Sequence, residues 1–339
     1  MTALVGEEGF TPPPDVLSER KPAPLLIRIL RRTLPMVVQA LATCLIVVIG
    51  SFLLIRFVPG DPVTSILGTR ATPETSAALR HELNLDQPLY KQLATTLSDT
   101  AHGDLGNSLA NPGQSVWDLL GPALPVTLGI AAIGIMLSVI IGVAVGVSAA
   151  VSRSRLLDLV VQIAAVVSLA TPAFLVALLL VLAFALRFTL FPAGGWGDGF
   201  DPKYVVLPAL TLSFALAPVI TRTARQAARS AVGEASVEAA IARGVPLHVI
   251  AIRHVAPNSL LPVISVVGVN IGMVLTSAMV VESVLGIPGL GSRILEAVST
   301  RDYPVIQAIA LLTAVFAVTA NLLADLLYGL LDPRLRRSA

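Results

Sequence analysis

The chain has 339 residues, of which 55% are hydrophobic and only 13% are charged, and its formal net charge is +2. A soluble protein carries roughly 25% charged residues, so charge is excluded from most of this chain. Its mean hydropathy of +0.83 is typical of a protein with several membrane spans. The small net charge argues against a nucleic-acid partner. The single cysteine, Cys44, excludes an internal disulfide and a four-cysteine zinc site.

The first 24 residues are polar, acidic and rich in proline, and they lack the basic start and short apolar core of a signal peptide. Residues 1–24 are therefore predicted to form a disordered tail in the cytoplasm. Residues 25–56 follow, with a first span at about 34–56. The basic stretch LLIRILRR (25–32) either lies flat on the inner leaflet or begins the span itself.

An outer segment of about sixty residues, 57–118, follows the first span. Two helix starts are expected in it, at Thr72-Pro73-Glu74 and at Asp86-Gln87-Pro88, because each offers a capping side chain and a proline near the first turn. Turns are predicted at GDLGNS (103–108) and NPG (111–113). This segment is predicted to be a small helical extracytoplasmic unit.

Residues 119–337 contain the remaining apolar windows, at about 123–150, 157–187, 204–222, 259–281 and 305–331. Windows of this length predict helices, because backbone groups in lipid must be satisfied within their own segment. If the N-terminus lies in the cytoplasm, the cytoplasmic segments hold more Lys and Arg than the outer segments do. The predicted fold is an all-α membrane protein with six transmembrane helices and both termini in the cytoplasm.

Several positions interrupt the predicted spans. Thr171-Pro172 is expected to break the third span and Pro218 to interrupt the fourth, either as gating hinges or as plain kinks. Gly142 and Gly146 form a G-x-x-x-G step, which predicts close helix packing within this chain or against a partner.

Polar side chains are few within the spans, and an acid at mid-bilayer costs roughly 3 kcal/mol. Glu282 lies near a span end, where structural packing is favoured over substrate contact. GIPGLG (286–291) lacks the ending of a phosphate loop and is predicted to be a tight turn or a re-entrant dip. The four histidines lack metal-ligand spacing, so no metal site is predicted. The candidate pathway or gate residues are Thr171, Pro172, Asn270, Glu282 and Gly289.

A charged hairpin, 233–257, separates the fourth and fifth spans. A short helix over 234–243 is expected to end at Gly244, in the left-handed conformation, with Pro246 preventing its continuation. A second short helix over 246–255 is expected to stop at Pro257. Alanines at 235, 239, 240 and 242 leave a slim surface that another protein's backbone can approach closely. The hairpin is therefore predicted to be a docking site for a soluble partner protein.

Glu238-Ala239-Ala240, Gly244 and Pro257 resemble the EAA motif of ABC-importer permeases, although His254-Val255-Ala256-Pro257 departs from the Ile-x-Leu-Pro ending of that motif. Over residues 25–337 an ordered set of further motifs is similar to the dipeptide/oligopeptide/nickel permease family, B type. They are FVPGDP (57–62), LDQPLYKQ (85–92), GDLGNS (103–108), LPALTLSF (207–214), VVESVLGIPGLG (280–291), RDYPVIQA (301–308) and DLLYGLLDPRLR (325–336).

This resemblance implies a type I importer permease in the bacterial plasma membrane. It implies a second, C-type permease as partner, two ATP-binding subunits or one fused ATPase that hold ATP and Mg²⁺, and an extracytoplasmic solute-binding lipoprotein. Peptides are the expected cargo, with nickel complexes and other small solutes as alternatives, and this chain is expected to hold no cofactor. The coupling residues implied are Glu238, Ala239, Ala240, Arg243, Gly244, Arg253 and Pro257.

Other classes of protein fit less well. No G-x-x-x-x-G-K-[ST] motif occurs, so ATP-driven work requires a separate chain. A stand-alone secondary transporter would show internal repeats or a buried ion site, and neither is visible in the sequence. An intramembrane enzyme would show His-Glu-x-x-His or paired acids, an ABC exporter would lack the EAA hairpin, and a DNA-reading hairpin would not lie between two spans.

Overall fold

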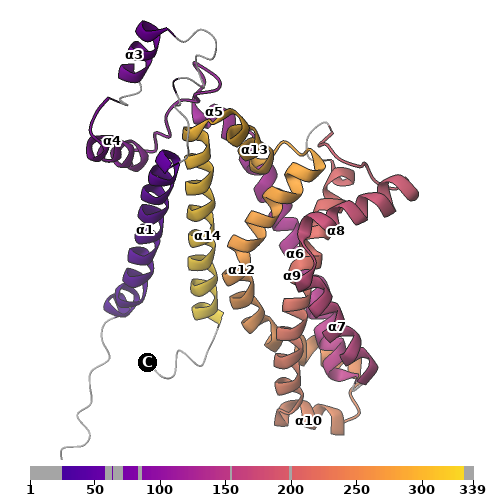
Figure 1. The fold of residues 1–339 in the computed structure, drawn as a ribbon. Coiled ribbons are helices and arrows are strands. Elements are labelled where there is room, and N and C mark those ends of the chain that lie inside the picture. Colours follow the sequence, from indigo (N-terminus) through magenta and orange to yellow (C-terminus); the bar gives the residue numbers. More distant parts are fainter. Residues whose placement is uncertain are drawn as a thin grey trace, which may run out of the picture.

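The computed structural model describes residues 25–57, 63, 72–82, 86–152, 155–197 and 201–331. Within these ranges the chain is helical, with an isolated antiparallel bridge between Asn107 and Ser115. Long helices lie side by side, with α3, α4, α5 and α13 at one end and α10 at the other (Figure 1). The predicted tail (1–24) and residues 332–337 lie outside the described residues.

Helix α1 (Leu25–Phe57) runs without a break through the basic stretch at its start. It packs beside α14 (Tyr303–Leu331), as Figure 1 shows. Its described side chains form an apolar stretch over Val37–Leu53. The basic stretch is thus continuous with the following helix and is not a separate element.

Three helices follow: α3 (Pro73–Glu82), α4 (Leu89–Ala101) and α5 (Val116–Leu120). The predicted start of α3 is confirmed, because the Thr72 hydroxyl accepts a hydrogen bond from the Thr75 N–H at 3.2 Å. The capping role of Asp86 is wrong: α4 begins after Pro88 with no side-chain cap. The predicted turns at 103–108 and 111–113 precede a capping box at Ser115 that starts α5.

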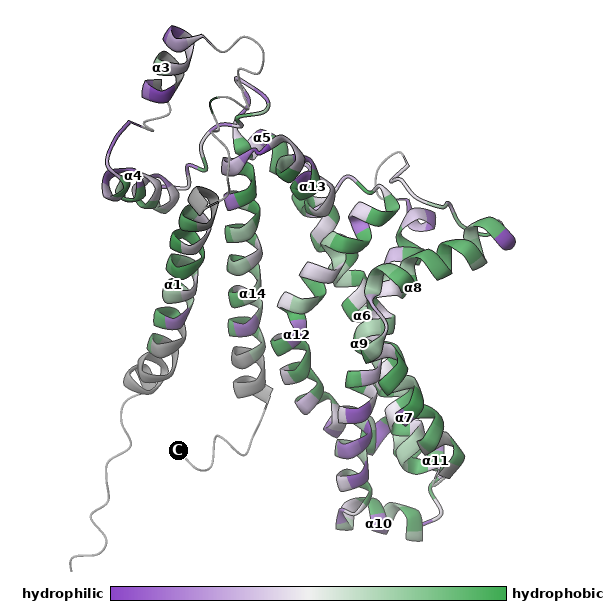
Figure 2. Cartoon of the chain, in the orientation of Figure 1, coloured by the Kyte–Doolittle hydropathy of each residue, from purple (hydrophilic) through white to green (hydrophobic). Residues whose placement is uncertain are grey.

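Four helical stretches of the described chain are long and apolar enough to cross a membrane, and a bent pair adds a fifth if it counts as one span. The four include α6 (Ala123–Val151), α9 (Pro202–Val232), α12 (Ala256–Leu285) and the described part of α14. Hydrophobic residues dominate these helices along much of their length (Figure 2). The all-helical membrane architecture is thus confirmed.

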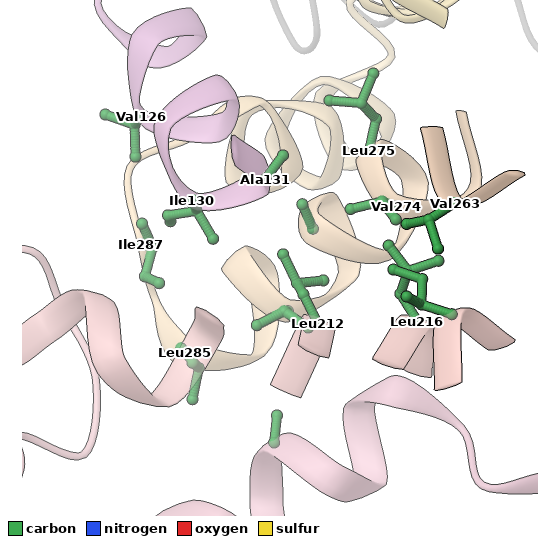
Figure 3. Close-up of a cluster of buried hydrophobic side chains, with 14 of the residues drawn as sticks. Val126, Ile130, Ala131, Leu212, Leu216, Val263, Val274, Leu275, Leu285 and Ile287 are labelled. Atoms are coloured by element: carbon green, nitrogen blue, oxygen red, sulfur yellow. The ribbon is translucent and has the colours of Figure 1, made fainter. Parts of the chain in front are cut away.

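Helices α6 and α9 share the most extensive contact among the described helices, and glycine makes their approach possible. A Cβ atom at Gly142 would lie 2.6 Å from Ile220 Cγ2, and one at Gly146 would lie 2.6 Å from the Thr221 carbonyl oxygen. The G-x-x-x-G step therefore packs against α9 of the same chain. Figure 3 shows the adjoining core, in which α6 and α9 meet α12; it includes Ile130, Leu212, Leu216, Val263, Val274 and Leu275.

The third predicted span is broken as expected. Helix α7 (Arg155–Ala170) ends before Thr171-Pro172, and α8 (Ala173–Leu180) continues into a π-helical turn, η2 (Val181–Arg187). The two arms, Leu159–Ala170 and Ala173–Arg187, are bent by 106° relative to each other. Such an angle makes the segment a broken span or a re-entrant element.

Pro218 does not end the fourth span, because α9 continues through both Pro208 and Pro218, and whether it acts as a hinge or a plain kink stays a prediction. Pro218 has no N–H, so the Phe214 carbonyl four residues earlier loses its helical donor. The Ser168 hydroxyl of α7 donates a hydrogen bond to that carbonyl instead. A neighbouring helix thus satisfies the group that the proline leaves free.

The inner hairpin joins the fifth helix differently from the prediction. Helix α10 (Ala235–Ala242) is followed by α11 (Leu247–Ile250), a π-helical turn η3 (Ala251–Val255) and α12. The expected stop at Pro257 is wrong, because the helical stretch continues through this proline, which lies two residues after the π-helical turn η3. One helical stretch of 39 residues, Leu247–Leu285, therefore connects the hairpin to α13 (Leu290–Thr300) at the far end.

Candidate functional site

Gly244 ends the first arm of the hairpin in a Schellman motif. Its φ is +75°, its N–H donates to the Ile241 carbonyl at 2.9 Å, and the Val245 N–H donates to the Ala240 carbonyl at 3.1 Å. No atom lies within 4 Å of the place where a Cβ would stand at Gly244. Glycine is therefore required here for its backbone conformation and not for space.

One face of α10 is part of the protein's own core. Val237 and Ala240 are buried against Ala228 and Ala231 of α9, together with Ile250 of α11. The prediction that Ala240 belongs to the slim outer surface is corrected, because Ala240 lies three residues after Val237 and shares its buried face. Its small side chain lets α10 lie close to α9.

The opposite face of α10 is exposed and carries Glu238, Ala239 and Arg243. The Arg243 Nε–H donates to the Ala239 carbonyl at 3.2 Å, which holds the side chain along the helix. Arg253 and Pro257 are also exposed, on the second arm and at the start of α12. The structure thus places every candidate coupling residue except Ala240 at the surface of this region.

Three large apolar side chains on the hairpin were not predicted from the sequence. Ile241 is 43% exposed, Leu247 57% and Ile252 72%. Exposed apolar side chains among charged ones are typical of a protein-docking surface. Ile241 lies four residues after the buried Val237, so helical spacing alone would place it near the buried face, and no local pattern in the sequence identifies its exposure.

At the α13 end of α12, Glu282 forms a buried cluster with the turn that follows it. The Gly291 N–H donates to Glu282 Oε2 at 2.8 Å, and the Leu290 N–H donates to the Thr127 hydroxyl of α6 at 2.9 Å. We call Thr127, Met279, Glu282, Gly289, Leu290 and Gly291 the Glu282 cluster. A carboxylate at the first turn of α13 is favoured by the helix dipole.

Glycine packing closes this cluster. A Cβ at Gly289 would overlap the Glu282 carboxyl group, and one at Gly291 would overlap the backbone of Met279. Gly286 ends α12 in the left-handed conformation with φ of +62°. GIPGLG is therefore a tight turn whose glycines let α13 fold back onto α12, as the first of the two predicted alternatives had it.

The pathway candidates do not form one site. Glu282 and Gly289 are in contact, whereas Asn270 lies twelve residues earlier on α12, roughly 18 Å along the helix. The Asn270 side-chain amide donates to the Val266 carbonyl at 2.7 Å. Thr171 and Pro172 lie at the junction of α7 and α8. Among the described residues, no group of His, Cys, Asp or Glu could hold a metal ion.

A second buried carboxylate, Asp302, ties the start of α14 to the loop before α5. It accepts hydrogen bonds from the Ser108 hydroxyl, from the Leu109 N–H at 3.1 Å and from the Ala110 N–H at 3.3 Å. Its partners lie almost two hundred residues earlier in the chain, so no local pattern identifies the contact. GDLGNS, which supplies Ser108, was predicted above as a turn and quoted as a family resemblance, and RDYPVIQA, which supplies Asp302, was quoted only as a family resemblance.

Asp302→Ala is expected to free the loop at 108–111. Loss of a hydrogen bond to a charged group costs about 1.5–3 kcal/mol, so backbone hydrogen exchange at the half-buried Leu109 and the exposed Ala110 is expected to accelerate on the order of tenfold or more. Hydrogen–deuterium exchange of the purified transporter measures this. The control is Glu296→Ala, which removes only the exposed Arg293–Glu296 ion pair. Unchanged exchange in Asp302→Ala would mean that the carboxylate does not anchor the loop.

Comparison with known proteins gives a consistent result. Residues 142–337 match the family described as binding-protein-dependent transport system inner membrane component, and residues 25–131 match the N-terminal part of such a membrane component. The oligopeptide transport system permease protein OppB of Haemophilus influenzae is 32% identical over 299 residues, covering 88% of this chain and 96% of that protein.

The dipeptide transport system permease protein DppB of Bacillus subtilis is 33% identical over 295 residues, covering 87% of this chain and 94% of that protein. OppB of Salmonella typhimurium is 34% identical over 309 residues, covering 91% of this chain and 98% of that protein. These matches confirm the resemblance carried by the sequence motifs and the location in the inner membrane. The chain therefore belongs to the family of binding-protein-dependent transport system inner membrane components, as an OppB- and DppB-like permease subunit of an ABC importer and not an enzyme.

Proposed function

We propose that this chain forms half of the translocation pathway of an importer that carries peptides. The curated relatives are named as oligopeptide and dipeptide permeases over nearly their whole length. The observation that carries the mechanism is the continuous helical stretch Leu247–Leu285, which joins the exposed hairpin to the Glu282 cluster. Movement of the hairpin is transmitted along this stretch to the opposite end of the molecule.

The proposed topology has six spans with both termini in the cytoplasm. It counts α1, α6, the bent pair α7–α8, α9, α12 and α14. The start of α1 and the α10 hairpin lie at the same end of the helices in Figure 1, which supports a cytoplasmic side that holds both. Residues 57–118 then form the extracytoplasmic segment, with α3, α4 and α5 at the other end.

The coupling surface is proposed to be the exposed side of the hairpin. Glu238, Ala239 and Arg243 of α10 and Arg253 of η3 contact an ATP-binding subunit, with Ile241 and Leu247 as apolar anchors. Ala240, Gly244 and Pro257 act indirectly, by setting the position of this surface. Nucleotide-driven movement requires these contacts to differ in free energy between the two states of the transporter.

The proposed partners are a second, homologous C-type permease, two ATP-binding subunits or one fused ATPase that hold ATP and Mg²⁺, and an extracytoplasmic binding lipoprotein. The family description, which names binding-protein dependence, supports the last of these. Large apolar side chains of α7, α8 and η2 are exposed in the isolated chain, including Leu159, Val166, Leu178 and Leu182. These surfaces fit lipid and a second membrane subunit. Nickel complexes remain the alternative cargo implied by the family.

Reconstitution tests this function directly. Proteoliposomes with both permeases, the ATPase and the binding protein are expected to accumulate radiolabelled peptide only with ATP and binding protein present. A catalytically dead ATPase serves as the control. Uptake by this chain alone would show a stand-alone transporter, and uptake of a nickel complex with no peptide uptake would assign the alternative cargo.

A further inference from the structure

A polar cavity of about 220 Å³ lies between α1, α12 and α14, far from the Glu282 cluster. Gln39 and Thr43 of α1, Ser265 of α12 and Asn321 of α14 line it. Ser265 lies seventeen residues before Glu282 on α12, roughly 26 Å along the helix. The cavity is therefore at membrane depth, nearer to the hairpin end.

Close packing forms the cavity wall opposite α1. A Cβ at Gly268 would overlap the Ala324 side chain, so α12 and α14 touch at this level. Gly268 and Ala324 also line the cavity, whose other wall is the polar face of α1. The space is thus bounded by three helices and is open on one side, where Gln39, Val269 and Asn321 are exposed in the isolated chain.

Three polar side chains of this cavity, Gln39, Ser265 and Asn321, have no hydrogen-bond partner among the described residues. The Thr43 hydroxyl donates to the Gln39 carbonyl at 2.9 Å, but no described residue forms a hydrogen bond with the side-chain amides of Gln39 or Asn321 or with the Ser265 hydroxyl. An amide or hydroxyl without a partner in an apolar medium costs about 2–7 kcal/mol. These groups are consequently expected to face water or a polar ligand in the working transporter.

We propose that this cavity binds the main chain of the peptide during its passage. The proposal rests on the function proposed above. A side-chain amide offers both donors and an acceptor, and a hydroxyl offers one of each, which matches the N–H and C=O of any peptide group. Among the described residues that line the cavity, none carries a charge. Binding there is therefore indifferent to the charge of the cargo's side chains, as transport of many peptide sequences requires.

Cysteine labelling in the complete, reconstituted transporter tests the position of the cavity. Cys44→Ser gives a background without thiols in this chain, because Cys44 is its single cysteine. In that background Asn321→Cys is compared with Leu323→Cys, an exposed site two residues further on α14. A charged, membrane-impermeant thiosulfonate is expected to modify Cys at 321, and only a lipid-soluble maleimide is expected to modify Cys at 323.

Cargo occupancy is the decisive readout. Saturating trialanine with its binding protein is expected to slow modification at position 321 on the order of tenfold and to leave position 323 unchanged. Modification at 321 by the lipid-soluble reagent alone would assign this face to lipid. If position 321 is protected by the second permease when no peptide is present, this face is a subunit contact. If position 321 is modified equally with and without peptide, the cavity holds only water. Each of these three results overturns the proposal.

Transport kinetics give the matching functional result. Asn321→Ala is expected to raise KM for trialanine, and for acidic and basic tripeptides, by a similar factor of about three to ten, because one main-chain hydrogen bond is lost. Asn321→Gln is expected to bring KM part of the way back to the wild-type value, and Leu323→Ala serves as the control. Unchanged KM in a transporter that imports trialanine refutes this site alone. No peptide uptake by the wild type would refute the peptide cargo and this site together.

Discussion

Gly244→Val is expected to reduce ATP-driven uptake on the order of tenfold or more while the transporter still assembles in the membrane. Gly244 has φ of +75°, which costs an ordinary L residue about 1–2 kcal/mol and a β-branched residue more. To relieve the strain, the Schellman bonds from Gly244 and Val245 must open and α10 must tilt. Uptake and ATPase activity of the same proteoliposomes measure the resulting loss of coupling.

Two variants separate backbone strain from bulk. Gly244→Asn is expected to retain most of the uptake, because asparagine tolerates the left-handed region. Gly233→Ala is the matched control at the end of α9: φ there is −82°, and the nearest atom to an added Cβ is 3.7 Å away. Coupled uptake at the wild-type level in Gly244→Val would show that the geometry of this turn is not needed for coupling.

Gly291→Ala is expected to be the most damaging single-methyl change at the α13 end. The added Cβ would overlap the carbonyl oxygen of Met279 and stand 2.5 Å from its carbonyl carbon. Because these are backbone atoms, no rotamer change relieves the overlap, and α13 must move away from α12. Overpacking of this kind costs about 1–3 kcal/mol, and more where backbone is displaced. The bond from the Gly291 N–H to Glu282 is expected to break as a result.

Thermal inactivation and peptide uptake of the purified complex measure this effect. Gly50→Ala on α1 is the control, because nothing lies within 4 Å of its Cβ position and alanine favours a helix by about 1 kcal/mol. Gly289→Ala is expected to be intermediate, since its Cβ would meet the Glu282 side chain, which can rotate. If Gly291→Ala matches Gly50→Ala in stability and uptake, the tight contact of α13 with α12 does not contribute to either.

These two expected results address opposite ends of one helical stretch. Leu247 begins it beside the hairpin, and Leu285 ends it before Gly286. The π-helical turn η3 lies within it, next to the hairpin. Inserted π-turns are frequent at functional positions, and this one sets the rotation of α12 relative to α11. A change at either end is therefore expected to affect transport by altering how movement passes along α12.

Local features could be predicted because their causes are local. Apolar windows of sufficient length identified the long helices, since lipid leaves the backbone no other way to satisfy its polar groups. The glycine at 244 followed by Pro246 located the end of α10, and Thr171-Pro172 located the break between α7 and α8. The ordered motifs identified the family, which the comparisons then confirmed.

Pro218 and Pro257 show where such prediction stops. A proline always removes one backbone N–H donor, but whether a helix ends there depends on which other group replaces that donor. Ser168 of another helix does so for Phe214, and the helical stretch continues through Pro257 two residues after the π-helical turn η3. Neither fact is visible within the neighbouring residues.

By itself the sequence determined that this protein is a helical membrane subunit, that helices end before Gly244 and at Thr171-Pro172, and which family it joins, because hydrophobic length, glycine and proline act over a few residues. Only the tertiary structure decided that Ala240 faces inward, that Asp302 holds the loop at 108–110, and that Glu282 meets Gly291. These depend on which helix faces are turned toward each other, and packing between distant segments sets that.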